Sequence, residues 1–205
     1  MTTFFENLEM ADKHATLAIN SFGSIFPDWL MPLVSDRLVW VPLYLLLVWI
    51  LIKRLGWRRA LVTLIIAVLA VAACDQFANL IKNWAQRFRP CRDGWMLDNG
   101  LRILEKKGSK FGFFSAHAAT LTGISVVILA SLKKYLPKSE PKSRLPFILG
   151  CCLSFWVLLV GASRIFVGKH FLGDVIVGIA AGLLTSWLVF KICDYLVSLQ
   201  EWEKL

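Results

Sequence analysis

Three polar residues in the last quarter of the sequence have the types and spacing that phosphoryl chemistry requires: Arg164, His170 and Asp174. If the chain is helical here, His170 and Asp174 share a helix face, so the carboxylate can accept a hydrogen bond from one imidazole nitrogen. The other nitrogen then suits a nucleophile or a proton carrier. The planar guanidinium of Arg164 matches the oxygens of a phosphoryl group. The alternative is a membrane interface, where His170 and Arg164 extend towards water and Asp174 caps a helix.

A second polar group, Ser115 and His117, begins the third apolar segment, where residues 113–118 read F-F-S-A-H-A. Serine is a favourable helix N-cap. The backbone N–H groups behind it, together with the helix dipole, form an anion-binding site. His117 falls in the first turn of this predicted helix. The alternative is an ordinary helix cap followed by a buried histidine.

A third polar group lies on the second apolar segment. Asp75, Asn79 and Lys82 are spaced by four and three residues, which places them on one face of a helix. If that helix continues, Arg89 returns near the same face, and Pro90 would then end the helix. Ionisable side chains at membrane depth are costly, so the aligned face indicates a direction into the bundle. The alternative is that Lys82 and Arg89 are interfacial anchors.

The composition indicates a membrane protein. Of the 205 residues, 57% are hydrophobic, and the mean hydropathy is +0.62, too apolar for a soluble domain. Several runs of roughly 20 apolar residues match the thickness of a bilayer. The sequence predicts an all-α polytopic membrane helix bundle with five transmembrane helices, at about residues 38–54, 60–82, 113–132, 145–163 and 171–192.

The N-terminal residues differ from these spans. In residues 3–20, apolar side chains recur at helical spacing against Glu6, Glu9, Asp12 and Lys13, a pattern too polar to cross a bilayer. We expect an amphipathic helix that lies in the membrane interface. The predicted organisation is one membrane domain over residues 1–205, with an N-terminal interfacial region at 1–37, a transmembrane bundle at 38–196 and a catalytic core at 75–190.

Positive charge predicts the orientation of the bundle. The formal net charge is +9, and the basic residues gather in short loops at 53–59 and 133–144. Such loops stay in the cytoplasm, and this bias accounts for the charge without a nucleic-acid partner. The N-terminus, the connector 83–112 and the turn 164–169 are then extracytoplasmic, and the C-terminus is cytoplasmic. One membrane face therefore carries Lys82, Arg89, Ser115, His117, Arg164, His170 and Asp174.

These residues resemble the three-part signature of the type 2 phosphatidic acid phosphatase family, over about residues 75–190. The first part is Lys82 with six residues before Arg89-Pro90, and the third is Ser163-Arg164 with five residues before His170 and three before Asp174. The middle part, Ser115-Ala116-His117, departs from the usual Pro-Ser-Gly-His of the family. Phe114 stands for the proline and Ala116 for the glycine. An alanine still donates its backbone N–H at a helix start.

The resemblance implies a mechanism without a metal or cofactor. His170 attacks phosphorus to form a phosphohistidine, and Asp174 orients it. His117 protonates the leaving lipid oxygen and later activates water. The phosphoryl oxygens are held by Lys82, Arg89, Arg164, the Ser115 hydroxyl and the N–H of Ala116. Convergent cations and a helix N-terminus are also what phosphoryl transfer needs physically. The carboxylates of the sequence lack the spacing of a magnesium site.

The family resemblance implies an integral membrane lipid phosphatase in a bacterial inner (cytoplasmic) membrane, with its site facing the extracytoplasmic side. The implied substrates are undecaprenyl pyrophosphate, phosphatidylglycerol phosphate or phosphatidate, and a lipid A phosphate, of which the outward site favours the first and the last. The connector 91–112 is either a lid over the head group or a solvated basic loop near anionic lipid. The alternatives are a lipid phosphotransferase with the same site and a non-catalytic protein that binds or transports lipid phosphates. The sequence carries no indication of the oligomeric state.

Overall fold

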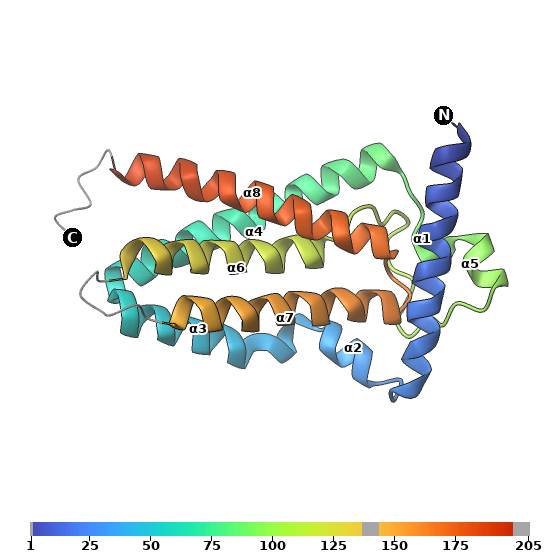
Figure 1. The fold of residues 1–205 in the computed structure, drawn as a ribbon, viewed down its shortest axis with the longest axis horizontal. Helices are drawn as coiled ribbons and strands as arrows, with labels where there is room; N and C mark the ends of the chain where they lie inside the picture. Colours follow the sequence, from blue (N-terminus) through green and yellow to red (C-terminus); the bar gives the residue numbers. More distant parts are fainter. Residues whose placement is uncertain (1, 137–143, 199–205) are drawn as a thin grey trace. The chain divides into compact units, whose positions relative to one another are not determined.

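The computed structural model describes residues 2–136 and 144–198, which are almost entirely helical (Figure 1). The one β-type pairing in these ranges is an isolated antiparallel bridge between Phe88 and Phe111. The predicted all-α class is confirmed. The α-helices are α1 (Thr2–Phe22), α2 (Leu30–Ser35), α3 (Val41–Leu55), α4 (Trp57–Ala85), α5 (Gly94–Asp98), α6 (Ala116–Tyr135), α7 (Leu145–Phe166) and α8 (Leu172–Ser198). The 3₁₀ helices are η1 (Gly23–Ile25), η2 (Arg37–Trp40) and η3 (Pro90–Arg92).

Five helical stretches of the described chain are long and apolar enough to cross a bilayer. At a rise of about 1.5 Å per residue, a helix of about 20 residues spans the hydrocarbon core. The five predicted spans are confirmed, with ends that differ by a few residues. They are Arg37–Leu55, Trp57–Ala85, Ala116–Tyr135, Leu145–Phe166 and Leu172–Leu196.

The chain reverses between α3 and α4 through a single residue, Gly56. Its φ of +79° is a conformation that favours glycine, and its N–H donates to the carbonyl of Ile52 at 3.0 Å. The Gly56 carbonyl then accepts a hydrogen bond from the N–H of Ala60, in the first turn of α4. One glycine therefore ends one span and begins the next.

The chain forms two compact units. The first, which we call the site unit, comprises Met1–Val39, Ala78–Ala118 and Leu158–Gly178. The second, the span unit, comprises Trp40–Phe77, Ala119–Val157 and Ile179–Leu205. Helices α4, α6, α7 and α8 each contribute residues to both units. The single-domain organisation expected from the sequence stays a prediction.

In the span unit, small residues allow α6 and α8 to pack closely. A Cβ atom at Gly123 would lie 2.5 Å from Ser186 Oγ, and one at Gly182 would lie 2.4 Å from the carbonyl oxygen of Ala119. Small residues have this role at membrane helix interfaces generally. Gly123 and Gly182 therefore permit the close approach of α6 and α8. A buried apolar cluster from α4, α6 and α8 adds to the packing and comprises Ile66, Ala67, Ala70, Val127 and Phe190.

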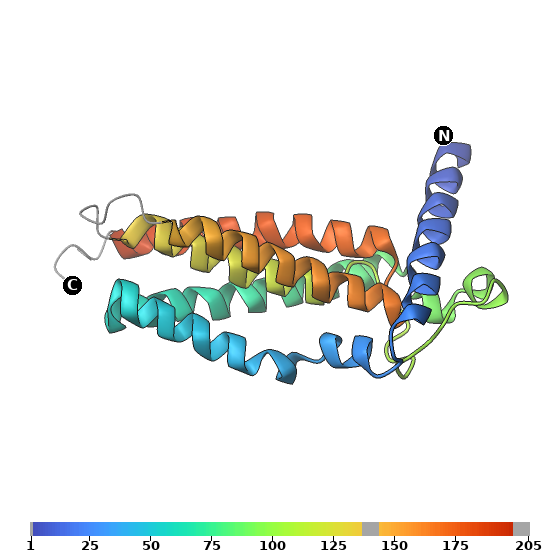
Figure 2. The ribbon, with the colours of Figure 1, turned by 60° about the horizontal axis from the view of Figure 1, so that its bottom comes forward.

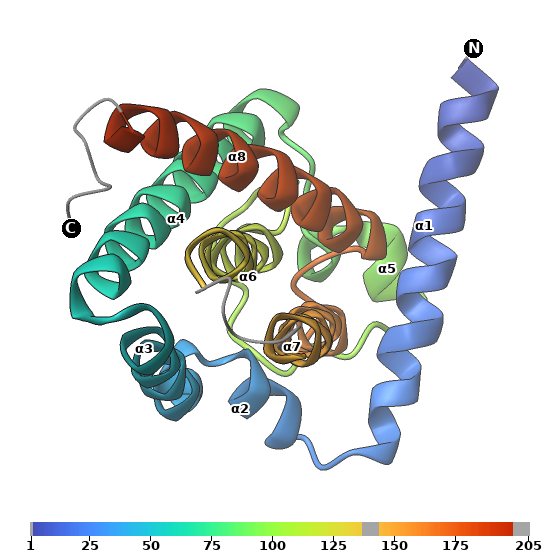
Figure 3. The same cartoon turned by 60° about the vertical axis from the view of Figure 1, so that its left-hand side comes forward.

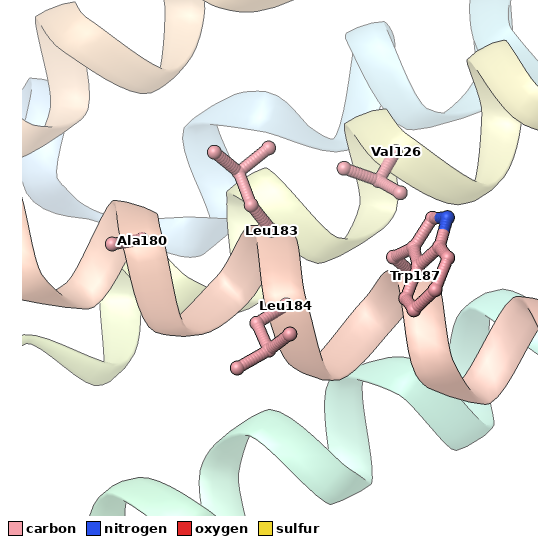
Figure 4. A pocket seen from close by; sticks show the side chains of 5 residues that line it. All are labelled: Val126, Ala180, Leu183, Leu184 and Trp187. Atoms are coloured by element: carbon pink, nitrogen blue, oxygen red, sulfur yellow. The ribbon is translucent and has the colours of Figure 1, made fainter.

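The span unit also has an apolar hollow between α6 and α8 (Figure 4). Its lining residues are Val126, Ala180, Leu183, Leu184 and Trp187. Every one of them is apolar, so this hollow offers no group for acid–base or nucleophilic chemistry.

In the site unit, α1 runs across the ends of α7 and α8 (Figure 2). The side-chain amide of Asn20 donates to the carbonyls of Ile165 at 3.0 Å and Phe166 at 2.9 Å, at the end of α7. Thr16 Oγ1 accepts a hydrogen bond from the N–H of Leu172 at 2.9 Å, at the start of α8. These bonds satisfy backbone groups that helix termini leave unpaired. Part of the polar face of α1 therefore packs against the ends of α7 and α8.

A second contact holds α1 against α5, which lies beside it (Figure 3). The rings of His14 and Trp95 meet edge to face with their centroids 4.9 Å apart. Lys13 pairs with Asp93, the N-cap of α5, at 2.9 Å. The predicted N-terminal helix is confirmed as a helix, and its position in the membrane interface stays a prediction.

Candidate active site

The expected pairing of His170 with Asp174 is present. His170 Nδ1 lies 3.3 Å from Asp174 Oδ2, and the two side chains are 3% and 0% exposed. The same carboxylate oxygen accepts a hydrogen bond from the N–H of Phe171 at 3.1 Å. His170 itself precedes α8, so the pair forms across the first turn of the helix. The Nδ1 position is thereby held by a charged acceptor, which leaves Nε2 for chemistry.

The turn between α7 and α8 orients His170. The carbonyl of Arg164 accepts hydrogen bonds from the N–H groups of Lys169 at 3.0 Å and His170 at 3.2 Å. Gly168 has a φ of +75°, and a Cβ atom there would lie 2.8 Å from the carbonyl oxygen of Arg102. Only glycine fits both requirements without strain. The local backbone therefore fixes the direction of the imidazole.

The buried position of His170 keeps its imidazole neutral. Burial lowers the pKa of His170 to about 4, although the hydrogen bond and the negative charge of Asp174 act to raise it. The positive charges of Arg89 and Arg164 lower it further. At neutral pH the ring therefore carries a lone pair, as a nucleophile requires.

Arg89 reaches the site by a route that differs from the sequence expectation. The helix of the second span does not continue to Pro90, because α4 ends at Ala85 and Gln86 has a φ of +49°. Phe88 forms an isolated antiparallel bridge with Phe111, and the backbone of Arg89 is extended. Arg89 donates from Nε to the Phe111 carbonyl at 3.2 Å and from Nη2 to Ser109 Oγ at 2.8 Å. These bonds fix its guanidinium beside the turn of His170.

Arg164 is buried, with 6% exposure, at the end of α7. Its Nη1 donates to Ser35 Oγ and to Glu105 Oε1, the latter at 3.2 Å. Its Nε–H is buried and has no hydrogen-bond partner within the described ranges. A buried donor without an acceptor is uncommon and costly. A phosphoryl oxygen is an acceptor that would satisfy it.

Sequence reasoning missed two charged residues at this point, Lys169 and Glu105. Lys169 is 6% exposed, and its Nζ donates to the carbonyl of Lys106 and lies 3.8 Å from Glu105 Oε2. Burial lowers the pKa of Lys169. The position of Lys169 directly before His170 was a visible signal. Glu105 stands in a basic connector with nothing local to single it out.

The N-terminus of α6 brings the middle motif to the same place. Ser115 is fully buried, its Oγ accepts a hydrogen bond from the N–H of Ala118 at 3.4 Å, and α6 begins at Ala116. The predicted N-cap is therefore confirmed. His117 lies within electrostatic range of His170, Arg164 and Lys82.

Lys82 is half-buried in the last turn of α4. Asn79 is exposed, so the expectation that this whole helix face points inward is wrong. All eight predicted site residues belong to the site unit.

Arg87 is a further residue that sequence reasoning missed. Its Nη1 donates to Asp174 Oδ1 at 2.9 Å, and its Nη2 donates to Asp12 Oδ2 at 2.7 Å. Its guanidinium carbon lies 4.0 Å from the centroid of the Phe171 ring. The signal was the R-F-R sequence, because residues two apart in an extended segment face the same side.

A cavity of about 750 Å³ in the site unit opens beside Arg87. Arg87, Asp12 and Glu9 contribute charged groups, and the other walls are apolar or backbone. The walls come from α1, the first turns of α8, the end of α4 and Phe113. Its size is within the usual range of ligand pockets.

Within the described residues, no three His, Cys, Asp or Glu side chains are grouped so that they could hold a metal ion. The positive charges that converge at His170 are those of arginine and lysine side chains. Together with a buried neutral imidazole and a helix N-terminus, they suit the transfer of an anionic group. Independence from metal stays a prediction.

Comparison with known proteins gives consistent matches. The family model described as the PAP2 superfamily matches residues 60–198. The lipid A 4′-phosphatase of Bacteroides thetaiotaomicron is 26% identical over 94% of this chain and 81% of its own length. The lipid A 4′-phosphatase of Porphyromonas gingivalis is 29% identical over 93% of this chain and 75% of its own length.

A solved structure matches as well. The PAP2-type phosphatidylglycerolphosphate phosphatase of Bacillus subtilis superposes with a TM-score of 0.64 at 22% identity, over 90% of this chain and 87% of that one. At this level of identity the match establishes a shared fold.

Proposed function

The chain belongs to the PAP2 superfamily and is an integral membrane lipid phosphatase. We propose that it hydrolyses a phosphate monoester of lipid A through a phosphohistidine at His170. One observation carries the mechanism. A neutral, buried imidazole is held at Nδ1 by Asp174, among guanidinium groups that act on it electrostatically. That is the arrangement of an oriented nucleophile facing an anion.

In the first step, Nε2 of His170 attacks phosphorus and the bond from phosphorus to the lipid oxygen breaks. His117 gives a proton to the departing oxygen, so the lipid leaves as an alcohol. Asp174 stabilises the positive imidazole that results, because its carboxylate already accepts the Nδ1–H. In the second step, His117 takes a proton from water, the resulting hydroxide attacks phosphorus, and the bond to Nε2 breaks. Inorganic phosphate leaves and both imidazoles return to their starting state.

The charge of the phosphoryl group is met by side chains and by a helix terminus. Arg89, Arg164 and Lys82 provide three positive charges, and the orphaned Nε–H of Arg164 provides a directed donor. The hydroxyl of Ser115 and the N–H of Ala116 complete the set at the start of α6. The alanine in place of the usual glycine keeps this donor, because a helical residue has a negative φ.

The substrate is proposed from three considerations. The two lipid A 4′-phosphatases match nearly the whole chain. The cavity beside Arg87 has apolar walls that include Ile176 and Val177 of a membrane span, which supports a substrate with acyl chains lying there. The basic loop residues stand at the opposite ends of α4, α6 and α7 from the site residues, which supports an extracytoplasmic site.

The test is a panel of lipids offered to the purified protein in detergent, with free phosphate measured. We expect release from lipid A, with mass spectrometry locating the lost phosphate at the 4′ position. Undecaprenyl pyrophosphate, phosphatidylglycerol phosphate and phosphatidate are the comparison arms. Faster release from any of these would overturn the lipid A assignment. Transfer of phosphate to a second lipid, with none released into water, would overturn hydrolysis itself.

A further inference from the structure

We propose that Arg87 is a positioning residue of the phosphatase reaction, and that Asp12 of α1 holds Arg87 in place. The inference rests on the proposed function, because it assigns Arg87 an effect that passes through Asp174 to the nucleophile His170. The N-terminal helix then belongs to the active site, where the sequence predicted only an amphipathic helix in the membrane interface.

The contacts form one continuous chain of charged hydrogen bonds. His170 bonds to one oxygen of Asp174 at 3.3 Å, and Arg87 bonds to the other oxygen at 2.9 Å. The second terminal nitrogen of Arg87 bonds to Asp12 Oδ2 at 2.7 Å. The other oxygen of Asp12 accepts the N–H of Gly173 at 2.8 Å, at the start of the helix that carries Asp174. This series of hydrogen bonds therefore meets α8 twice, at Asp174 and at Gly173.

This arrangement restricts each member. A guanidinium is planar and presents its donors in a rigid fork, so two bonds in different directions fix the orientation of Arg87. The ring of Phe171 covers one face of that plane, with the guanidinium carbon 4.0 Å from the ring centroid. Asp174 is 0% exposed, so water cannot replace Arg87 as a donor to its second oxygen. Without Arg87 that oxygen is left unpaired, and the carboxylate is held less firmly in its orientation beside His170.

Arg87 and Asp12 act on the protonation of His170 in opposite directions. The charged and titratable groups around the pair are Arg87 and Arg89 after α4, Arg164 on α7, His117 on α6, Asp12 on α1, Lys169 in the turn and Glu105 in the connector. Loss of a positive charge stabilises the protonated form of His170, and loss of a negative charge destabilises it. Removal of Arg87 should therefore move the acid limb of activity to higher pH. Removal of the charge of Asp12 should move it to lower pH.

A purely structural role makes a different prediction. Asp12 and Lys13 are neighbours on α1, and both form ion pairs with other segments, Lys13 with Asp93 at 2.9 Å. If Arg87 and Asp12 only dock α1, loss of the Lys13 pair should have the same effect on activity. Lys13 does not touch the His170–Asp174 pair, so Lys13→Gln is the matched control.

The experiment compares Arg87→Gln, Arg87→Lys, Asp12→Asn and Lys13→Gln with the wild-type protein. The measurements are kcat, KM and the pH profile on a short, water-soluble phosphate ester, which has no acyl chain to occupy the cavity beside Arg87. We expect Arg87→Gln to lower kcat by about 10²-fold with KM unchanged, as a misplaced nucleophile would. Arg87→Lys should recover part of this loss. Arg87→Gln and Asp12→Asn should shift the acid limb in opposite directions, and Lys13→Gln should change neither kcat nor the limb.

Equal losses in Asp12→Asn and Lys13→Gln, or an unshifted acid limb in a folded Arg87→Gln variant, would overturn the inference. If Arg87→Gln does not fold, the isosteric Asp12→Asn variant decides the question by the shift of its acid limb, and Arg87→Lys decides it by a partial loss of kcat. His170→Ala separates this from the proposed function. Activity in His170→Ala refutes the phosphohistidine itself, whereas an inactive His170→Ala beside a fully active Arg87→Gln refutes only the role of Arg87.

Discussion

The backbone N–H of Ser115 donates to the backbone carbonyl of Asp174 at 2.9 Å. This bond joins the residue before α6 to the first turn of α8. His117 follows Ser115 by two residues, and Asp174 holds His170. One hydrogen bond therefore sets the spacing between the proposed nucleophile and the proposed acid–base group. A reaction that needs in-line geometry depends on such spacing.

The close approach of α8 to α6 makes Gly178 sensitive to substitution. A Cβ atom there would lie 2.6 Å from the carbonyl oxygen of Ser115. We expect Gly178→Ala to cost about 1–3 kcal/mol of stability, as overpacking does, and to lower kcat. Thermal unfolding in detergent and kinetics measure both. Gly94→Ala is the control, since a Cβ atom at Gly94 meets nothing within 4 Å. Equal behaviour of the two variants would refute the packing constraint.

The two histidines should respond differently to the leaving group. His170→Ala should abolish phosphate release from every substrate, because the nucleophile is gone. His117→Ala should lower release from a lipid phosphate by about 10²–10⁴-fold, as loss of a general acid does. An aryl phosphate needs no protonation of its leaving group, so its cleavage by His117→Ala should leave trapped phosphohistidine. Absence of labelled phosphohistidine in that variant would contradict the assignment.

The pH dependence of kcat/KM should follow the protonation of the His170 imidazole. Burial lowers its pKa to about 4, so we expect kcat/KM to remain high well below the ordinary histidine value of about 6.5 and to fall near 4. A pH titration of kcat/KM on the wild-type protein checks this. An acid limb at about 6.5 would contradict the buried, neutral state.

The pH dependence of the free energy of unfolding provides a second test of the lowered pKa of His170. Between about pH 4 and 6.5 the unfolded chain binds more protons at His170 than the folded chain, so the free energy of unfolding rises with pH. The gain over this window is about 3 kcal/mol and is complete above about pH 6.5. Denaturation of the wild type and His170→Gln on both sides of the window should show this slope only in the wild type.

The cavity beside Arg87 should determine the preference for lipid. Ala15→Phe places a ring in its α1 wall. We expect the KM for a long-chain lipid phosphate to rise by about 10-fold or more, with no change for a short, water-soluble phosphate ester. Ala18→Phe, on the same helix but outside the cavity lining, is the control. An equal effect on both substrates would show that the substitution disturbs the site and not a chain-binding wall.

Removal of metal should leave activity unchanged. Arginine and lysine side chains supply the positive charge that the proposed mechanism requires, so phosphate release should survive EDTA at full rate. The measurement is initial rate before and after dialysis against the chelator. A loss of activity that magnesium restores would overturn the metal-free mechanism.

The sequence by itself determined the five spans, the Ser115 cap and the pairing of His170 with Asp174. These features depend on local regularities: apolar length, residue preferences at a helix start, and a four-residue spacing. Each feature can be recognised from neighbouring residues alone, because it does not depend on how the rest of the chain folds.

Only the tertiary structure decided how Arg87 and Arg89 enter the site and what α1 contacts. The extended segment after Ala85 takes its direction from Phe111, more than twenty residues away, and periodicity carries no information about such a pairing. In the sequence, nothing distinguishes Asp12 and Glu105 from acidic residues exposed to solvent. They become site residues because the fold places them against the half-buried Arg87 and the buried Arg164, and a cation removed from water requires a partner.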